Sequence, residues 1–204
     1  MSQSTAEIER SLPRHTDGAR SFGWWGMVWL IATEATLFAS LLASYFYLRF
    51  RHGVEWPPDG LPHPELSLPL IMSAILLSSS IPMHIAESGI KKGKVTVLRV
   101  GLAIGFLLGA TFLALTVGVE WPETLHEFTP RTNVYGSLFF TITGFHAMHV
   151  LVGLAMSAWA QVRAWKGAFD SDRHVTIQNF TMYWHFVDTV WIFVFLTLYL
   201  SPRF

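Results

Sequence analysis

The stretch that decides the fold is Tyr183-Trp184-His185-Phe186-Val187-Asp188-Thr189-Val190-Trp191. It lies within an otherwise apolar run from Phe180 to Leu200, which is just long enough to cross a bilayer as a helix. His185 and Asp188 stand at the centre of that run. A carboxylate at mid-membrane costs roughly 2.5–3.5 kcal/mol on insertion scales, so it persists there only if another group pairs with it. We therefore expect Asp188 to be a paired group.

Four further apolar blocks precede this one, and each reaches the roughly 20 residues that a spanning helix needs. Short segments rich in proline, glycine and charge separate the blocks. The pattern predicts an all-α fold, a membrane bundle of five transmembrane helices in a single domain, residues 22–204. The expected spans are about 22–48, 66–90, 95–119, 134–162 and 178–201. Residues 1–21 are polar and mixed in charge, and we expect them to form a flexible tail outside the membrane.

The composition agrees with this class of protein. Of the 204 residues, 51% are hydrophobic and only 14% are charged, whereas a soluble domain has about 25% charged residues. The net charge is zero, so binding of nucleic acid has no electrostatic support. Cysteine is absent, which excludes disulfides, thiolate metal sites and cysteine nucleophiles.

Lysine and arginine are distributed unequally between alternate loops. Ten of the 14 basic residues fall in the tail and in the second and fourth loops, which share one side of a five-span chain. Basic loops remain on the inner side of the membrane. The predicted orientation has the N-terminus inside and the C-terminus outside. The ten residues are Arg10, Arg14, Arg20, Lys91, Lys92, Lys94, Arg99, Arg163, Lys166 and Arg173.

Small residues recur every four positions on two of the spans. Such stripes allow helix backbones to approach closely, which drives helix association where the hydrophobic effect cannot. We predict two packing seams, Gly101, Gly105 and Gly109 on the third span and Ala35, Ala39 and Ala43 on the first.

Glu34 lies near the centre of the first span. Ionisable residues at that depth normally face the protein interior or water, and they often mark pathways for protons or ions. The alternative, which we favour, is a hydrogen-bonded glutamate that locks two helices together or meets a partner subunit.

His146 and His149 are three residues apart on the fourth span and share a face, as His185 and Asp188 do on the fifth. Two such pairs could hold a metal, relay protons, or form a hydrogen-bond network between helices. Five of the nine histidines fall in the tail or loops, so few histidines remain within the spans to serve as metal ligands. We favour the network, in which Asp188 holds the last helix in register with the fourth. Whether its partner is a histidine or another subunit stays open.

A third polar feature lies at the inner end of the second span. Ser80, His84 and Glu87 follow one another at helical spacing and make a stripe. We interpret this stripe as interfacial and exposed to water.

Four segments, in order along the chain, resemble the subunit III family of the haem-copper respiratory oxidases. Trp25-Gly26-Met27, continuing through Thr33-Glu34 to Phe38, resembles the first helix that all members share. Trp56-Pro57-Pro58-Asp59-Gly60 resembles its outer loop, and Tyr183 to Trp191 resembles its last helix. The most distinctive helix of the family is matched by Tyr135-Gly136-Ser137-Leu138-Phe139-Phe140 and Thr143-Gly144-Phe145-His146-Ala147-Met148-His149-Val150. The chain is similar to the short, five-helix bacterial form.

The resemblance implies an accessory subunit of a proton-pumping terminal oxidase in a bacterial inner membrane. It implies no catalytic residue, haem, copper or other metal on this chain, because the redox centres belong to the partner subunits I and II. Packing against subunit I, binding of phospholipid and support of proton uptake are implied in the same way. Interior polar residues at the subunit or lipid interface would be Glu34, His84, His146, His149, Trp184, His185 and Asp188.

Several alternatives stay open at this stage. Within the same family, the complex could be a quinol oxidase or an assembly related to nitric oxide reductase. Outside it, the chain could be a small proton or ion transporter built on Glu34 and the two pairs on the fourth and fifth spans. It could also be a metal-dependent membrane enzyme that uses His146, His149, His185 and Asp188. The sequence does not name the electron donor.

Overall fold

A computed structural model describes residues 21–53, 56–58, 61 and 65–204. The predicted tail, except for Ser21, and part of the predicted outer loop, Asp59 and Gly60, lie outside these residues. Within the described ranges the chain forms helices and turns without any β-strand, which confirms the all-α fold.

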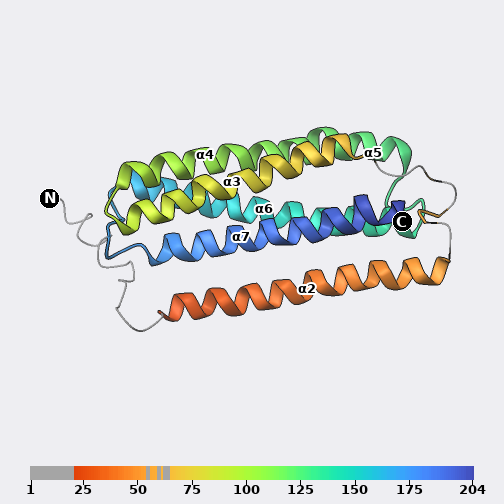
Figure 1. Ribbon diagram of the computed structural model, residues 1–204, viewed down its shortest axis with the longest axis horizontal. Helices are drawn as coiled ribbons and strands as arrows, with labels where there is room; N and C mark the ends of the chain where they lie inside the picture. The colour runs from red at the N-terminus through yellow and green to blue at the C-terminus, as the bar shows by residue number, and fades with distance from the viewer. Residues whose placement is uncertain (1–20, 54–55, 59–60, 62–64) are drawn as a thin grey trace.

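Long helices run the length of the molecule and alternate in direction (Figure 1). Five of them are long and apolar enough to cross a membrane, as predicted. The third, α4, continues through a π-helical segment, η1, into α5, and the last, α7, continues through a second π-helical segment, η2, into a 3-10 turn, η3. The bounds are α2 Phe22–His52, α3 Ser67–Lys91, α4 Val95–Leu115, η1 Thr116–Glu120, α5 Trp121–Glu127, α6 Val134–Trp165, α7 Val175–Phe195, η2 Leu196–Leu200 and η3 Ser201–Arg203.

Local sequence explains where these helices begin and turn. The Ser21 side chain accepts a hydrogen bond from the Trp24 backbone N–H at the start of α2, and the Asn133 side chain does the same for Gly136 at the start of α6. Between α3 and α4 the chain reverses at Gly93, whose φ of 73° is a left-handed conformation that glycine adopts without steric cost.

Close packing of α4 depends on its glycines. A Cβ added to Gly101 would lie 2.6 Å from the Pro82 carbonyl oxygen on α3. At Gly105 it would lie 2.5 Å from the end of the Met83 side chain. At Gly109 it would meet the Trp184 ring of α7 at 2.6 Å. The glycine stripe therefore faces α3 and α7, and the absence of side chains there allows the helices to approach.

Helix α2 stands apart from α3 and α4 and packs on α7 and α6 (Figure 1). Of the 18-residue apolar stretch that makes α2 long enough to span a membrane, 6% is buried within the bundle. The corresponding share is 50% in the spans of α6 and α7. The predicted alanine seam is wrong as a seam within this chain, because Ala35, Ala39 and Ala43 are exposed. The helix turns Phe38 and Tyr45 inward instead, since these large rings bury far more apolar surface than alanine does.

The two ends of the bundle differ in charge. The turn between α3 and α4 and the loop between α6 and α7 lie at one end, and the C-terminus and α5 lie at the other (Figure 1). The basic residues of the second and fourth loops therefore gather at the same end. Which end faces the inside of the cell stays a prediction from the charge rule.

Candidate functional site

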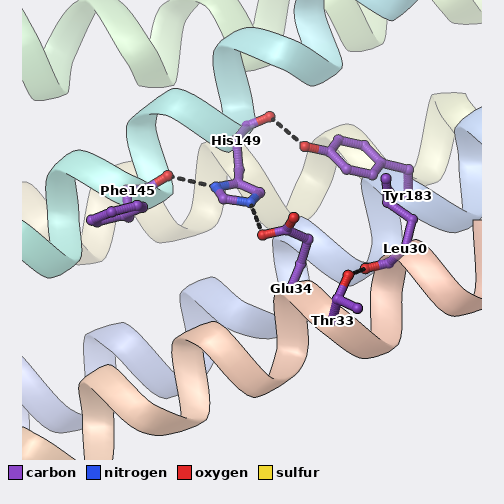
Figure 2. A network of polar contacts seen from close by, with 6 residues as sticks. All are labelled: Leu30, Thr33, Glu34, Phe145, His149 and Tyr183. Atoms are coloured by element: carbon purple, nitrogen blue, oxygen red, sulfur yellow. Dashed lines mark hydrogen bonds and ion pairs between the residues drawn. The ribbon is translucent and has the colours of Figure 1, made fainter.

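An acid–histidine pair connects α2 to α6. The Glu34 Oε2 and His149 Nε2 atoms lie 3.0 Å apart, and Figure 2 shows the two side chains pointing toward each other. His149 Nδ1 lies 2.7 Å from the Phe145 carbonyl oxygen, which can only accept, so Nδ1 carries a hydrogen. Nε2 then either accepts a hydrogen bond from the protonated carboxyl of a neutral Glu34 or, in an imidazolium ring, donates one to the Glu34 carboxylate. In both states the pair is neutral overall.

The same pair is tied to α7 and lies at the edge of the bundle. The Tyr183 hydroxyl donates to the His149 carbonyl oxygen at 3.2 Å (Figure 2). The Glu34 side chain keeps 29% of its surface exposed, whereas His149 keeps 8%. Glu34 is therefore partly accessible at the surface of the bundle, while its partner is almost fully enclosed.

Hydroxyl groups on α2 are satisfied within the helix itself. Thr33 donates to the Leu30 carbonyl oxygen at 2.7 Å (Figure 2). Three other exposed hydroxyls donate to carbonyls four residues earlier, so the exposed side of α2 between residues 32 and 44 carries small side chains whose hydroxyl hydrogens are already used within the helix. They belong to Thr36, Ser40 and Ser44.

A second polar centre connects α7 to α3. Ser80 Oγ donates a hydrogen bond to Asp188 Oδ2 and lies 2.8 Å from His185 Nδ1. When the serine hydroxyl gives its single hydrogen to an ionised Asp188, His185 Nδ1 donates in the other contact, so the tautomer of His185 depends on the protonation of Asp188. Asp188 itself is buried, with 5% of its surface exposed. The prediction that Asp188 pairs with another group is confirmed.

The predicted link from Asp188 to the fourth span is wrong. Its partner is Ser80 of α3, because Asp188 lies on the side of α7 that faces α3. His146, three residues before His149, has only 1% of its surface exposed and no hydrogen bond on either ring nitrogen. Its ring packs as an aromatic group, with centroids 4.9 Å from Trp191 and 5.8 Å from Phe112.

The polar stripe predicted on α3 divides into three environments. Ser80 belongs to the centre with Asp188, and Glu87 is buried and pairs with Lys91 at 2.5 Å. Only His84 is exposed, with its ring centroid 6.4 Å from that of His185. The expectation of a stripe fully exposed to water is therefore wrong for Ser80 and Glu87.

Both tryptophans of the opening stretch donate to serines of α3. Trp184 Nε1 lies 2.8 Å from Ser79 Oγ, and Trp191 Nε1 lies 2.9 Å from Ser73 Oγ. Both rings are buried, with 0% and 1% of their surface exposed. Sequence reasoning missed these serines. The signal that could have found them is the run of polar residues that ends in Ser80 inside an apolar span.

Taken together, these side chains join helices. The two acids near the middle of their helices are bonded to different neighbouring helices, Glu34 to α6 and Asp188 to α3. Among the described residues, no group of three or more histidine, cysteine, aspartate or glutamate side chains could hold a metal ion. The arrangement can lock helix positions and can hold a proton between Glu34 and His149.

Five apolar helices of membrane-spanning length, with mid-helix acids that join α2 to α6 and α7 to α3, define a multi-pass membrane protein. The sequence profile of the family described as cytochrome c oxidase subunit III matches residues 8–202. This chain belongs to the cytochrome c oxidase subunit III family. It is therefore a subunit of a multi-subunit oxidase complex of the haem-copper class.

Relatives from distant organisms have similar identities. Cytochrome c oxidase subunit 3 of Thermostichus vulcanus is 34% identical over 206 aligned residues, covering 100% of this chain and 97% of that protein. The protein of the same name from Locusta migratoria is 34% identical over 180 residues, covering 86% of this chain and 67% of its own length. That from Petromyzon marinus is 33% identical over 193 residues, covering 92% of this chain and 73% of its own length.

Proposed function

We propose that this chain is the non-catalytic subunit III of a proton-pumping terminal oxidase, and that it stabilises subunit I. The observation that carries the proposal is the use of the two mid-helix acids, Glu34 and Asp188, as ties between helices. An acid that is bonded to a neighbouring helix holds the bundle in one arrangement. A rigid bundle is what a stabilising subunit needs to present to its partner.

We place the haem and copper of the complex on the partner subunits I and II. Both ring nitrogens of His149 are engaged by groups of this chain. His146 stands among aromatic rings, where the ligand set of a haem or copper centre would need further donors. These contacts support a chain that contributes no redox centre.

The exposed side of α2 is where we place the contact with subunit I. Small side chains cover its middle part, residues 32–44, which favours close approach of another helix there. A partly exposed carboxylate at Glu34 would otherwise face hydrocarbon, where it is costly. A partner helix would cover both features, and phospholipid would fill the remaining gaps along the bundle.

The proposed setting is the inner membrane of a bacterium, with the N-terminus inside and the C-terminus outside. The charge asymmetry of the loops supports this orientation. The electron donor, cytochrome c or quinol, is determined by the partner subunits in this scheme.

The test is purification of the assembly through an affinity tag on this chain in detergent. We expect mass spectrometry to find subunits I and II, and an optical spectrum to show haem that is absent from the isolated chain. A complex without haem and without a subunit I would contradict the proposal. Proton transport by the isolated chain in liposomes would favour a transporter, and a stoichiometric metal bound to the isolated chain would favour a metal enzyme.

A further inference from the structure

A cavity of ≈ 330 Å³ lies at the end of the bundle that holds α5 and the C-terminus. It is bounded by residues around the start of α3, by η1 and α5, by the start of α6 and by η2. A volume of this size lies within the range of pockets that hold small groups. Four of its lining residues are glutamates, namely Glu65, Glu120, Glu123 and Glu127.

Glu120 is the buried member of this set. Only 4% of its surface is exposed, and its Oε1 accepts a hydrogen bond from the Tyr199 hydroxyl. Its other carboxylate oxygen, Oε2, is buried and has no hydrogen-bond partner among the described residues. A buried acceptor without a partner is costly, so a donor that reached this oxygen would stabilise it.

The two residues that meet here both belong to π-helical segments. Glu120 ends η1, and Tyr199 lies in η2. Less than 1% of residues in proteins are in π-helices, and such segments occur often at functional sites. Here each segment departs from α-helical geometry where its side chain reaches the other across the cavity.

The remaining three glutamates form an exposed rim. Glu123 and Glu127 follow Glu120 at intervals of three and four residues, which places all three on one face of the continuous helix. Glu65 approaches from the residues before α3 and is also exposed. No lysine, arginine or histidine belongs to the described lining. The cavity is thus strongly acidic without a cation of its own, and it attracts positive charge.

Apolar side chains make up most of the rest of the lining. Leu68, Pro69, Phe128 and Phe139 form this part of the wall, and Thr124 and Tyr199 complete it. Lysine and arginine match such a lining, because their aliphatic stems lie along apolar surface while the charged head reaches an acid. A chelated metal matches it poorly, since no three described acid or histidine side chains converge closely enough to hold one.

We propose that this cavity receives a lysine or arginine side chain from another subunit of the oxidase complex. The inference rests on membership of that complex and adds a second contact to the one proposed along α2. In this arrangement the charged head approaches Glu120 and the rim carboxylates surround it. Charge-assisted hydrogen bonds of this kind are about twice as strong as neutral ones.

The experiment measures how firmly the chain is held in the purified complex. The complex is captured through a tag on a different subunit and washed with increasing salt, and the retained chain is measured by mass spectrometry. The variant is the double change Glu123→Gln and Glu127→Gln, which leaves the buried Glu120–Tyr199 contact intact. The matched control is Asp170→Asn with Asp172→Asn, which removes two exposed acids at the opposite end and keeps an oxygen acceptor at residue 170.

We expect the rim variant to be held about tenfold more weakly than the control, and wild-type retention to fall as salt rises. A carbodiimide that joins carboxylates to amines should link Glu123 or Glu127 to the other subunit if the partner is lysine. A rim variant retained as firmly as the control at every salt concentration overturns the inference. The inference is also overturned if Mn²⁺ binds the wild-type complex and fails to bind the rim variant, while the rim variant is retained as firmly as the wild type.

Failure of the cavity inference can be distinguished from failure of the proposed function. If the rim variant is retained normally while Asp188→Leu still releases the chain, the cavity inference fails and the stabilising role stands. If the chain is never found with other oxidase subunits, the proposed function fails first.

Discussion

Replacing Gly101 with alanine tests how closely α4 approaches α3. The new Cβ would lie 2.6 Å from the Pro82 carbonyl oxygen and 2.8 Å from the Ala86 Cβ. Both distances are well under the 3.4 Å at which ordinary contact begins. One neighbour is backbone and the other is a short side chain on the same helix, so neither can move aside without displacing α3.

The magnitude follows from two opposing effects. Overpacking a close helix contact costs about 1–3 kcal/mol. Alanine in place of glycine within a helix returns about 0.8–1.0 kcal/mol of helix propensity. Gly144→Ala supplies the matched control, because nothing lies within 4 Å of a Cβ added there. The difference between Gly101→Ala and Gly144→Ala therefore isolates the clash, and we expect it to be about 1–3 kcal/mol of lost stability.

Two further glycines on α4 extend this into a ranked series. At Gly109 the added Cβ meets the buried Trp184 ring at 2.6 Å, and at Gly105 it meets the flexible end of Met83 at 2.5 Å. A methionine tail can move aside, whereas a ring enclosed on both sides cannot. We expect Gly101→Ala and Gly109→Ala to be clearly destabilising, and Gly105→Ala to be nearly neutral.

The assay is thermal release of the chain from the purified complex in detergent. Aliquots are heated, separated by gel filtration, and the chain that remains in the complex is measured by mass spectrometry. For a chain of this length each kcal/mol corresponds to about 2–4 °C in midpoint. Equal midpoints for Gly101→Ala and Gly144→Ala would refute the close approach of α4 to α3. A Gly105→Ala midpoint below that of Gly101→Ala would refute the ranking.

Three other substitutions address the polar centres. Asp188→Leu should weaken retention of the chain in the complex more than Asp188→Asn does, because asparagine keeps an oxygen acceptor for the Ser80 hydroxyl of α3. Equal retention of the two variants in a pull-down would contradict this. Glu34→Gln should leave assembly and the initial rate of oxygen reduction unchanged, since the glutamine amide can still donate to His149 Nε2. Immediate loss of turnover in an intact complex would instead place Glu34 on a proton path. Trp191→Phe should lower stability by about 0.6–1.7 kcal/mol through loss of the bond to Ser73, and adding Ser73→Ala should cost little more. A double variant far less stable than Trp191→Phe would show that the indole bond is a minor part of the contact.

The long helices could be predicted from the sequence because run length and hydropathy are properties of single segments. Burial of Asp188 followed in the same way, since an ionised side chain in an apolar run must be paired. Its partner could not be predicted. Ser80 is one of several serines on α3, and the rotation of α7 that selects it depends on how Trp184 fits between Gly109 and Gly153.

The two stripes of small residues also show that the sequence does not reveal which element packs against a helix face. The periodicity of Gly101, Gly105 and Gly109 is equivalent to that of the alanines on α2, yet only the glycines face a helix of this chain. Spacing identifies a face and does not say what covers it. The π-helical segments left no periodic signal at all, because a single added residue per turn is lost within a uniformly apolar run.

The attachment of α2 has a consequence for the order in which the protein is made. Glu34 is bonded to a residue 115 positions later, and the Tyr45 hydroxyl lies 3.1 Å from Ser201 Oγ, which is 156 positions later. Chains are synthesised from the N-terminus at about 5–20 residues per second. Helix α2 is therefore held by two helices that are synthesised later, and for several seconds the chain has not yet supplied the partner of the Glu34 carboxylate. Another membrane helix that shelters α2 during this interval would influence whether the bundle closes correctly.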